Sequence, residues 1–197
     1  MRRTLLMGPL VAAFLACAPI AGGPPPTSIP MGSKHEAGLS TTLGAQIACQ
    51  GPSCSPSISA IYPEQNLWYR QRIDEQSELH LMGGGLLSGG VISYISAGYR
   101  RYFPSEANQP KVGLDVKFGG FYVAEVGVPI SYKLDEEPIW LTVHPAVGSN
   151  PFGMVNVPVG IVWEPRTEFR ISTLLGVRAI GDNPTLIYGN AGLSFPF

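Results

Sequence analysis

The stretch TLIYGNAGLSFPF at residues 185–197 decides the fold class of this chain. Its odd positions carry the apolar side chains of Ile187, Ala191, Leu193, Phe195 and Phe197, whereas its even positions are mostly small or polar. Side chains alternate between the two faces of a β-strand, so this stretch predicts a strand with one apolar and one polar face.

The same alternation recurs along the chain. In residues 168–179, for example, Phe169 and Ile171 share one face while Arg170 and Arg178 share the other. Counting such segments predicts about ten strands, at residues 36–47, 65–73, 77–87, 91–103, 112–121, 123–134, 139–148, 153–163, 168–179 and 185–197. An eight-stranded arrangement, with residues 65–87 partly outside the wall, is the alternative.

Two kinds of fold produce this alternation. In a soluble periplasmic β-sandwich the apolar faces form the core, and in a membrane barrel they contact lipid. Strand lengths near the 9–11 residues of a tilted membrane strand favour the barrel, and so do aromatic residues at strand ends, such as Phe103, Tyr132 and Trp163. We therefore expect an all-β fold, an antiparallel up-and-down transmembrane β-barrel, at residues 35–197.

Composition agrees with a barrel. Charged residues make up 14% of the chain, compared with about 25% in soluble domains. Its 197 residues suffice for one domain. After the first 20 residues no apolar run is long enough for a membrane helix. The net charge of −1 supplies no basic surface, so no nucleic-acid partner is expected.

The N-terminal region predicts export. Residues 1–16 combine Arg2 and Arg3 with an apolar run, as a signal peptide does. Residues 17–34 are rich in Pro and Gly and predict an extended tether that packs no core. The sequence Phe14-Leu15-Ala16-Cys17 resembles a bacterial lipobox, which implies lipidation of Cys17. Ordinary signal cleavage nearby is the alternative.

The closing strand, with its alternating apolar residues and terminal Phe197, resembles the recognition end of Gram-negative outer-membrane proteins. The resemblance implies an outer-membrane location, contact with outer-membrane lipid, and assembly by the barrel-assembly machinery. An envelope protein is a further candidate partner.

The chain has three cysteines. With Cys17 assigned to lipid, Cys49 and Cys54 remain for a disulfide across the Gly51-Pro52 turn, which export permits. A ring this small stabilises by only ~2 kcal/mol, so the bond is expected to stiffen a loop. A metal site at these cysteines would lack further ligands.

The polar strand faces predict a charged lumen. Both signs occur there in similar numbers, and buried charges are stable only when paired. We expect a filled lumen and a structural or scaffold role, with a narrow channel for small solutes as the alternative. The predicted lumen network comprises Glu78, His80, Arg100, Asp115, Lys117, Glu125, Lys133, His144, Arg170 and Arg178, with Glu36, Arg70 and Arg72 on the same faces.

No catalytic, cofactor or metal site is predicted. Some small outer-membrane barrels are lipid-modifying enzymes, and the lipid A deacylases have a His followed two residues later by Ser. Here Pro145 and Ala146 follow His144, which does not match that pattern. The glycine-rich run at residues 83–90 lacks the Lys-Ser/Thr of a phosphate-binding loop.

Overall fold

A computed structural model describes residues 23–50, 55–86, 94–106, 109–119, 123–134, 137–149, 153–180 and 183–197. Within these ranges the backbone alone is described at residues 46–50, 55–62, 86, 123, 180 and 183–185. Cys17 and Cys54 lie outside the described residues, and so does the side chain of Cys49, so the predicted lipidation and disulfide remain predictions.

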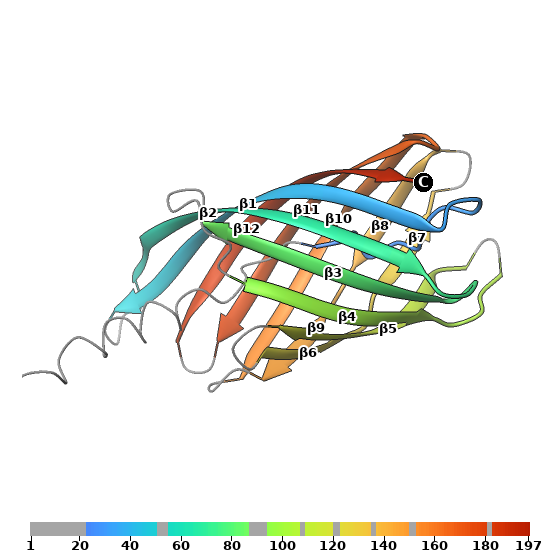
Figure 1. The fold of residues 1–197 in the computed structure, drawn as a ribbon. Helices are drawn as coiled ribbons and strands as arrows, with labels where there is room; N and C mark the ends of the chain where they lie inside the picture. The colour runs from blue at the N-terminus through green and yellow to red at the C-terminus, as the bar shows by residue number, and fades with distance from the viewer. Residues whose placement is uncertain are drawn as a thin grey trace, which may run out of the picture.

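The described chain forms a closed antiparallel barrel (Figure 1). Neighbouring strands pair in sequence order, and the last strand pairs with the first, with Leu39 opposite Leu193. The strand segments are β1 (His35–Gln50), β2 (Ser55–Arg72), β3 (Ser77–Leu86), β4 (Tyr94–Tyr102), β5 (Lys111–Gly119), β6 (Val123–Gly127), β7 (Ile130–Lys133), β8 (Ile139–Val143), β9 (Ala146–Ser149), β10 (Met154–Arg166), β11 (Phe169–Ile180) and β12 (Asn183–Pro196).

Two pairs of these twelve segments each build a single wall strand, so the barrel wall has ten strands. β6 and β7 both pair with β5, while β8 and β9 both pair with β10. This confirms the predicted fold class and strand count. The eight-stranded alternative is wrong, because residues 64–72 of β2 pair with residues 78–86 of β3 within the wall.

Prolines cause both interruptions. Pro129 separates β6 from β7, and Pro145 separates β8 from β9. Proline has no N–H to donate to the ladder, so regular pairing stops beside it. The two breaks meet across the wall, where the Val128 N–H donates to the Pro145 carbonyl at 2.8 Å. The prediction of continuous strands at residues 123–134 and 139–148 is therefore wrong at these prolines.

The second strand is longer than predicted. It begins at Ser55 rather than near residue 65, and it pairs with β1 as far as Gln50 opposite Ser55. The expected turn after it is present: the Gln76 N–H donates to the Asp74 carboxylate at 2.8 Å, and this bond lowers the pKa of that exposed carboxyl.

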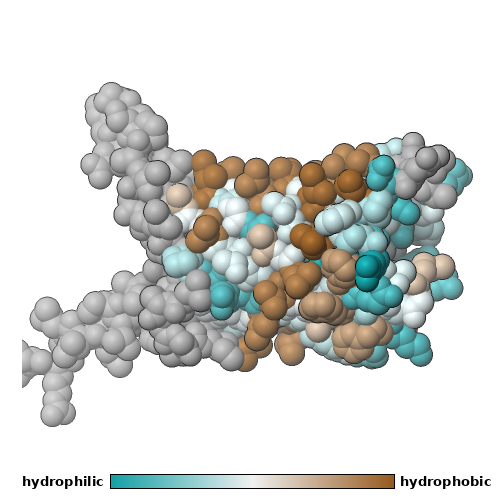
Figure 2. Space-filling view, turned by 90° about the horizontal axis from the view of Figure 1, so that it is seen from above, coloured by the Kyte–Doolittle hydropathy of each residue, from teal (hydrophilic) through white to brown (hydrophobic). Residues whose placement is uncertain are grey.

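The two faces of the wall differ as the alternation predicted. Val157 and Ile171 are 40% and 37% exposed on the outside, whereas Arg170 and Glu125 are 2% and 7% exposed inside. Figure 2 shows hydrophobic residues spread over the outer surface and hydrophilic residues gathered towards one end. A soluble sandwich would show the reverse, so that alternative is wrong.

Glycines on the wall make room for large interior side chains. A Cβ at Gly98 would overlap the His80 imidazole, and one at Gly176 would overlap the Tyr188 ring. A Cβ at Gly38 would likewise overlap the ring of Trp68 on the neighbouring strand. Large residues therefore face glycines across adjacent strands, which is how the narrow interior is packed.

The two barrel ends differ in what they carry. The end we call the terminal end bears Phe197 and the connections after β2, β4, β7 and β10. The opposite end, which we call the loop end, is where β1, β3, β5, β9 and β11 end. No helix in the described part of the chain is long and apolar enough to cross a membrane.

Candidate functional site in the barrel lumen

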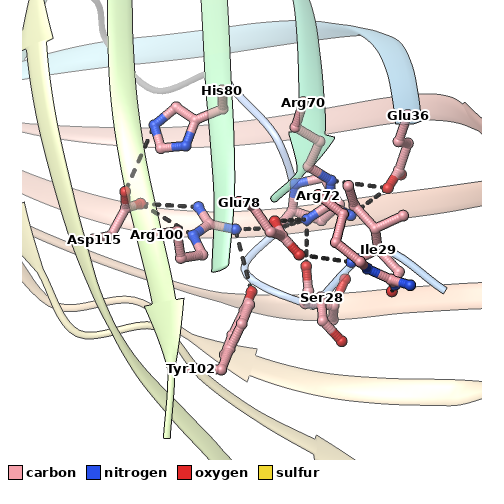
Figure 3. A network of polar contacts seen from close by, with 12 residues as sticks. Ser28, Ile29, Glu36, Arg70, Arg72, Glu78, His80, Arg100, Tyr102 and Asp115 are labelled. Atoms are coloured by element: carbon pink, nitrogen blue, oxygen red, sulfur yellow. Dashed lines mark hydrogen bonds and ion pairs between the residues drawn. The ribbon is translucent and has the colours of Figure 1, made fainter. Parts of the chain in front are cut away.

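A network of buried ion pairs and hydrogen bonds lies in the lumen, and Figure 3 shows part of it. Its first centre is Arg70 on β2, which is fully buried. Arg70 Nε donates to Glu36 Oε2 at 2.8 Å, and Arg70 Nη1 lies 3.1 Å from Glu78 Oε2. The register places Glu36 directly opposite Arg70, and it places Glu78 opposite Arg72, two residues along the same face of β2.

Glu36 also links the first strand to the last two. Arg170 Nη1 on β11 lies 3.2 Å from Glu36 Oε2, and the Ser194 hydroxyl on β12 donates to Glu36 Oε1 at 2.6 Å. Arg170 forms a second ion pair with Glu164. These contacts join β11, β12, β1 and β2 across the point where the barrel closes.

The second centre is Asp115 on β5. Arg100 Nη2 lies 2.9 Å from Asp115 Oδ2. Two imidazoles flank the same carboxylate, with His80 Nε2 at 3.5 Å from Oδ1 and His144 Nε2 at 3.4 Å from Oδ2. Lys117 lies 4.0 Å from Asp115. One carboxylate thus lies close to basic side chains from several strands.

A partly exposed pair adjoins this centre. Lys117 Nζ lies 2.5 Å from Glu125 Oε1, and the Lys117 side chain is 19% exposed. Among the described residues no group of three or more His, Cys, Asp and Glu is arranged to hold a metal ion.

Residues 23–30 enter the lumen and lie against the network. Pro25, Thr27 and Ile29 are fully buried. The Ile29 N–H donates to Glu78 Oε1 at 2.8 Å. A Cβ built on Gly23 would lie 3.0 Å from Met82 Sδ, deeper in the barrel than Glu78 on the same strand. The segment therefore runs from the terminal end inward.

Four arginines, which we call the arginine cradle, donate to main-chain carbonyls of this segment: Arg70, Arg72, Arg100 and Arg170. Arg100 Nη1 donates to the Pro25 carbonyl at 2.8 Å, and Arg170 Nη2 donates to the Ser28 carbonyl at 2.9 Å. Further bonds run from Arg70 to Thr27, and from Arg72 to Ile29 and Pro30. Lys111 Nζ adds a bond to Ser28 Oγ at 3.2 Å.

The expectation that the Pro- and Gly-rich residues 17–34 pack no core does not hold for residues 23–30, where Pro25, Thr27 and Ile29 are buried. Composition argued against packing because proline and glycine build no apolar core. Here the segment packs by other means: its carbonyls satisfy guanidinium groups that the wall leaves without enough acceptors. No local pattern in the sequence predicts this packing, because the arginines that contact the segment come from three separate strands, β2, β4 and β11.

Among the described residues, the side chains in the loop-end half of the lumen are also largely polar. The Tyr94 hydroxyl donates to Glu64 Oε1 at 2.8 Å, and the Tyr188 hydroxyl donates to Asn156 Oδ1 at 2.7 Å. Trp68, Met82 and Tyr94 form a buried apolar cluster. Side chains thus occupy this part of the lumen as well.

The structure places the predicted lumen residues as follows. Lys133 is exposed, because it is the last residue of β7 at the terminal end, so it lies outside the buried network. Lys117 is partly exposed. The residues that are buried inside the barrel are Glu78, His80, Arg100, Asp115, Glu125, His144, Arg170 and Arg178, together with Glu36 and Arg70.

Comparison with known proteins supports the fold. No protein-family model matches the chain, and no curated protein matches it either. An outer-membrane channel from Pseudomonas putida F1 is 9% identical, covers 86% of this chain and 97% of its own, and superposes with a TM-score of 0.51. At this identity the likeness concerns the fold alone, which is that of an outer-membrane β-barrel.

Other solved barrels match over similar lengths. The translocator domain of the autotransporter NalP from Neisseria meningitidis is 10% identical, with 98% of this chain and 95% of that chain covered and a TM-score of 0.47. The attachment invasion locus protein Ail of Yersinia pestis is 13% identical, with 84% and 99% covered and a TM-score of 0.41.

Proposed function

We propose that this protein resides in the bacterial outer membrane as a closed barrel with a structural or scaffold role. The observation that carries the proposal is the contrast between its faces: apolar side chains such as Val159 and Ile161 are 46% and 47% exposed outside, while the charged side chains are paired inside. So large an exposed apolar surface is stable in lipid and unstable in water.

The terminal end is proposed to face the periplasm. In outer-membrane barrels with an even number of strands both ends of the barrel domain lie on the periplasmic side. The strands β1 and β12 accordingly begin and end together, where the His35 N–H donates to the Phe197 carbonyl at 2.9 Å. An extracellular position for the loop end follows.

A closed lumen is supported by its occupants. The buried Arg70, Arg100 and Arg170 each have a carboxylate partner, and residues 23–30 lie between them. Barrels of this size have little interior space beyond their own side chains. Ions would have to displace both the segment and the ion pairs to pass.

Two measurements test the proposal. Heat-modifiable migration of the refolded protein in detergent gels is expected, because a closed barrel stays compact until it is boiled. In planar bilayers the unmodified protein is expected to give no current steps. Regular conductance steps from the full chain would contradict the closed scaffold and favour the second candidate, a narrow channel for small solutes.

The channel candidate is favoured by one observation, the partly exposed Lys117 side chain, which offers a hydrated charge at the edge of the network. A lipid-modifying enzyme is less well supported. His80 and His144 lie inside the barrel beside Asp115, away from the outer face where a lipid substrate would be.

We also propose the export features expected from the sequence. These are cleavage of residues 1–16, lipidation of Cys17, a disulfide between Cys49 and Cys54, and insertion by the barrel-assembly machinery through the last strand. Mass spectrometry of the mature protein, with and without reduction, measures the first three directly. A mature N-terminus beyond Cys17 would contradict lipidation.

A further inference from the structure

We infer that the terminal-end half of the lumen is a binding site for an extended, proline-rich peptide, and that residues 23–30 are its exchangeable resident ligand. The inference rests on the closed barrel proposed above, since it identifies what closes that barrel. It assigns to the arginine cradle a ligand class, a polypeptide offering consecutive main-chain carbonyls.

The chemistry of the two sides is complementary. Guanidinium groups only donate hydrogen bonds, and proline residues offer a carbonyl acceptor without an N–H donor. Residues 24–26 and 30 are proline, so few N–H groups of the segment need acceptors inside the barrel. One of the remaining N–H groups, that of Ile29, donates to Glu78.

Proline also reduces the cost of binding. Its ring fixes φ near −65°, so a proline-rich segment loses less conformational freedom when it is held extended. A segment of ordinary composition would bring an N–H at every residue and more entropy to lose. The lumen therefore selects for proline content rather than for one particular sequence.

The segment is separable from the wall. Residues 23–30 belong to no strand, and their described main-chain contacts with the barrel go to side chains rather than to the ladder. Arg70, Arg100 and Arg170 retain Glu36, Asp115 and Glu36 respectively when the segment leaves. The wall should accordingly stay folded with the site vacant or occupied by another peptide.

The exit lies at the terminal end. Met31 is 92% exposed, and Gly32 beside it has a φ of 97° that glycine adopts without strain. Residues 31–34 thus connect the buried segment to β1 by a short exposed link. A second polypeptide on that side could reach the same carbonyl-binding groups.

The experiment uses the full mature chain with a site-specific protease site in place of residues 31–33. The protein is refolded in detergent, cleaved, and passed through gel filtration, and the released N-terminal fragment is followed by mass spectrometry. The probe is a fluorescein-labelled synthetic peptide of residues 23–33, whose binding is read by anisotropy. Because the barrel is the same in every arm, differences between peptides do not reflect folding.

The fragment is expected to remain bound after cleavage and to be replaced by excess synthetic peptide. A matched peptide with Ala in place of Pro24, Pro25 and Pro26 should bind at least about tenfold more weakly, because each new N–H is buried without an acceptor. Loss of the fragment with no binding of the probe would overturn the inference. Retention without exchange, or equal binding of the alanine peptide, would do so too.

A deletion variant tests the inference if the protease does not cleave the chain. Deleting residues 23–30 should leave a barrel that still shows heat-modifiable migration, and the synthetic peptide should raise its melting temperature. A deletion variant that does not fold would overturn the separability on which exchange depends. The closed-barrel proposal fails separately, through conductance of the uncleaved chain, which requires no peptide.

Discussion

Glu36 and Arg70 face each other across the first hairpin of the barrel, both fully buried, with Arg70 Nε donating to Glu36 Oε2 at 2.8 Å. Glu36 also accepts from Arg170 and Ser194 on the last two strands. A single carboxylate thus serves both the first hairpin and the closure of the barrel. Because Glu36 is buried, its charge stabilises the fold only while all of these partners are present.

Glu36→Ala should therefore destabilise the barrel by about 3–5 kcal/mol, because it leaves Arg70 and Arg170 short of a buried counter-charge. Urea unfolding in lipid vesicles measures the change. The control is Glu106→Ala in the exposed connection after β4, which should change the free energy of unfolding very little. Equal effects from the two variants would contradict a structural role for the Glu36 network.

Gly176→Ala should destabilise the barrel by about 1–3 kcal/mol through overpacking, because the added Cβ overlaps the Tyr188 ring. Gly189 provides a matched control on the adjacent strand. The nearest atom to a Cβ there is Leu175 Cδ2 at 3.5 Å, an ordinary contact. In the same unfolding assay, Gly189→Ala should have nearly the same free energy of unfolding as the parent protein. An unchanged free energy of unfolding for Gly176→Ala would contradict tight packing of the interior.

Val159→Arg should cost about 2–4 kcal/mol if the outer face contacts hydrocarbon, because Val159 lies near the middle of β10. Phe103→Arg should cost only about 0–1 kcal/mol, because Phe103 follows the end of β4 at the terminal end. Folding into vesicles measures both. A penalty that does not depend on depth would count against a membrane-spanning wall.

Phe197→Ala should reduce the amount of protein in the outer membrane of cells while changing its stability in vitro only slightly. The Phe197 ring stacks on the His35 ring with 5.6 Å between the ring centroids, but Phe197 is 63% exposed. Its removal therefore takes away few packing contacts. Cell fractionation and vesicle unfolding give the two quantities. Phe103→Ala, at the same end, is the control; similar membrane levels for both variants would argue against recognition of the last strand by the assembly machinery.

Much of the fold could be predicted from local sequence. The alternation of apolar and polar residues has the period of a strand. It therefore predicted most strand positions, the number of strands in the wall, and the outward or inward face of residues such as Val157 and Arg170. It did not locate the breaks at Pro129 and Pro145, since a proline on a strand is compatible with either an edge or a break.

The occupant of the lumen depends on distant residues. Arg170 and Ser28 are joined by a hydrogen bond of 2.9 Å although 142 positions separate them. No periodicity predicts such a contact, because it exists only after closure has brought β11, β1 and β2 around one space. For the same reason the exposed position of Lys133 depended on where its strand meets the rim.

The amino-acid sequence by itself determined which side chains face outward and inward, because that property belongs to each strand alone. Only the tertiary structure decided which buried charges become partners and that residues 23–30 lie among them. Pairing of this kind is a property of the closed cylinder, in which four arginines from β2, β4 and β11 donate to the carbonyls of a segment outside the sheet.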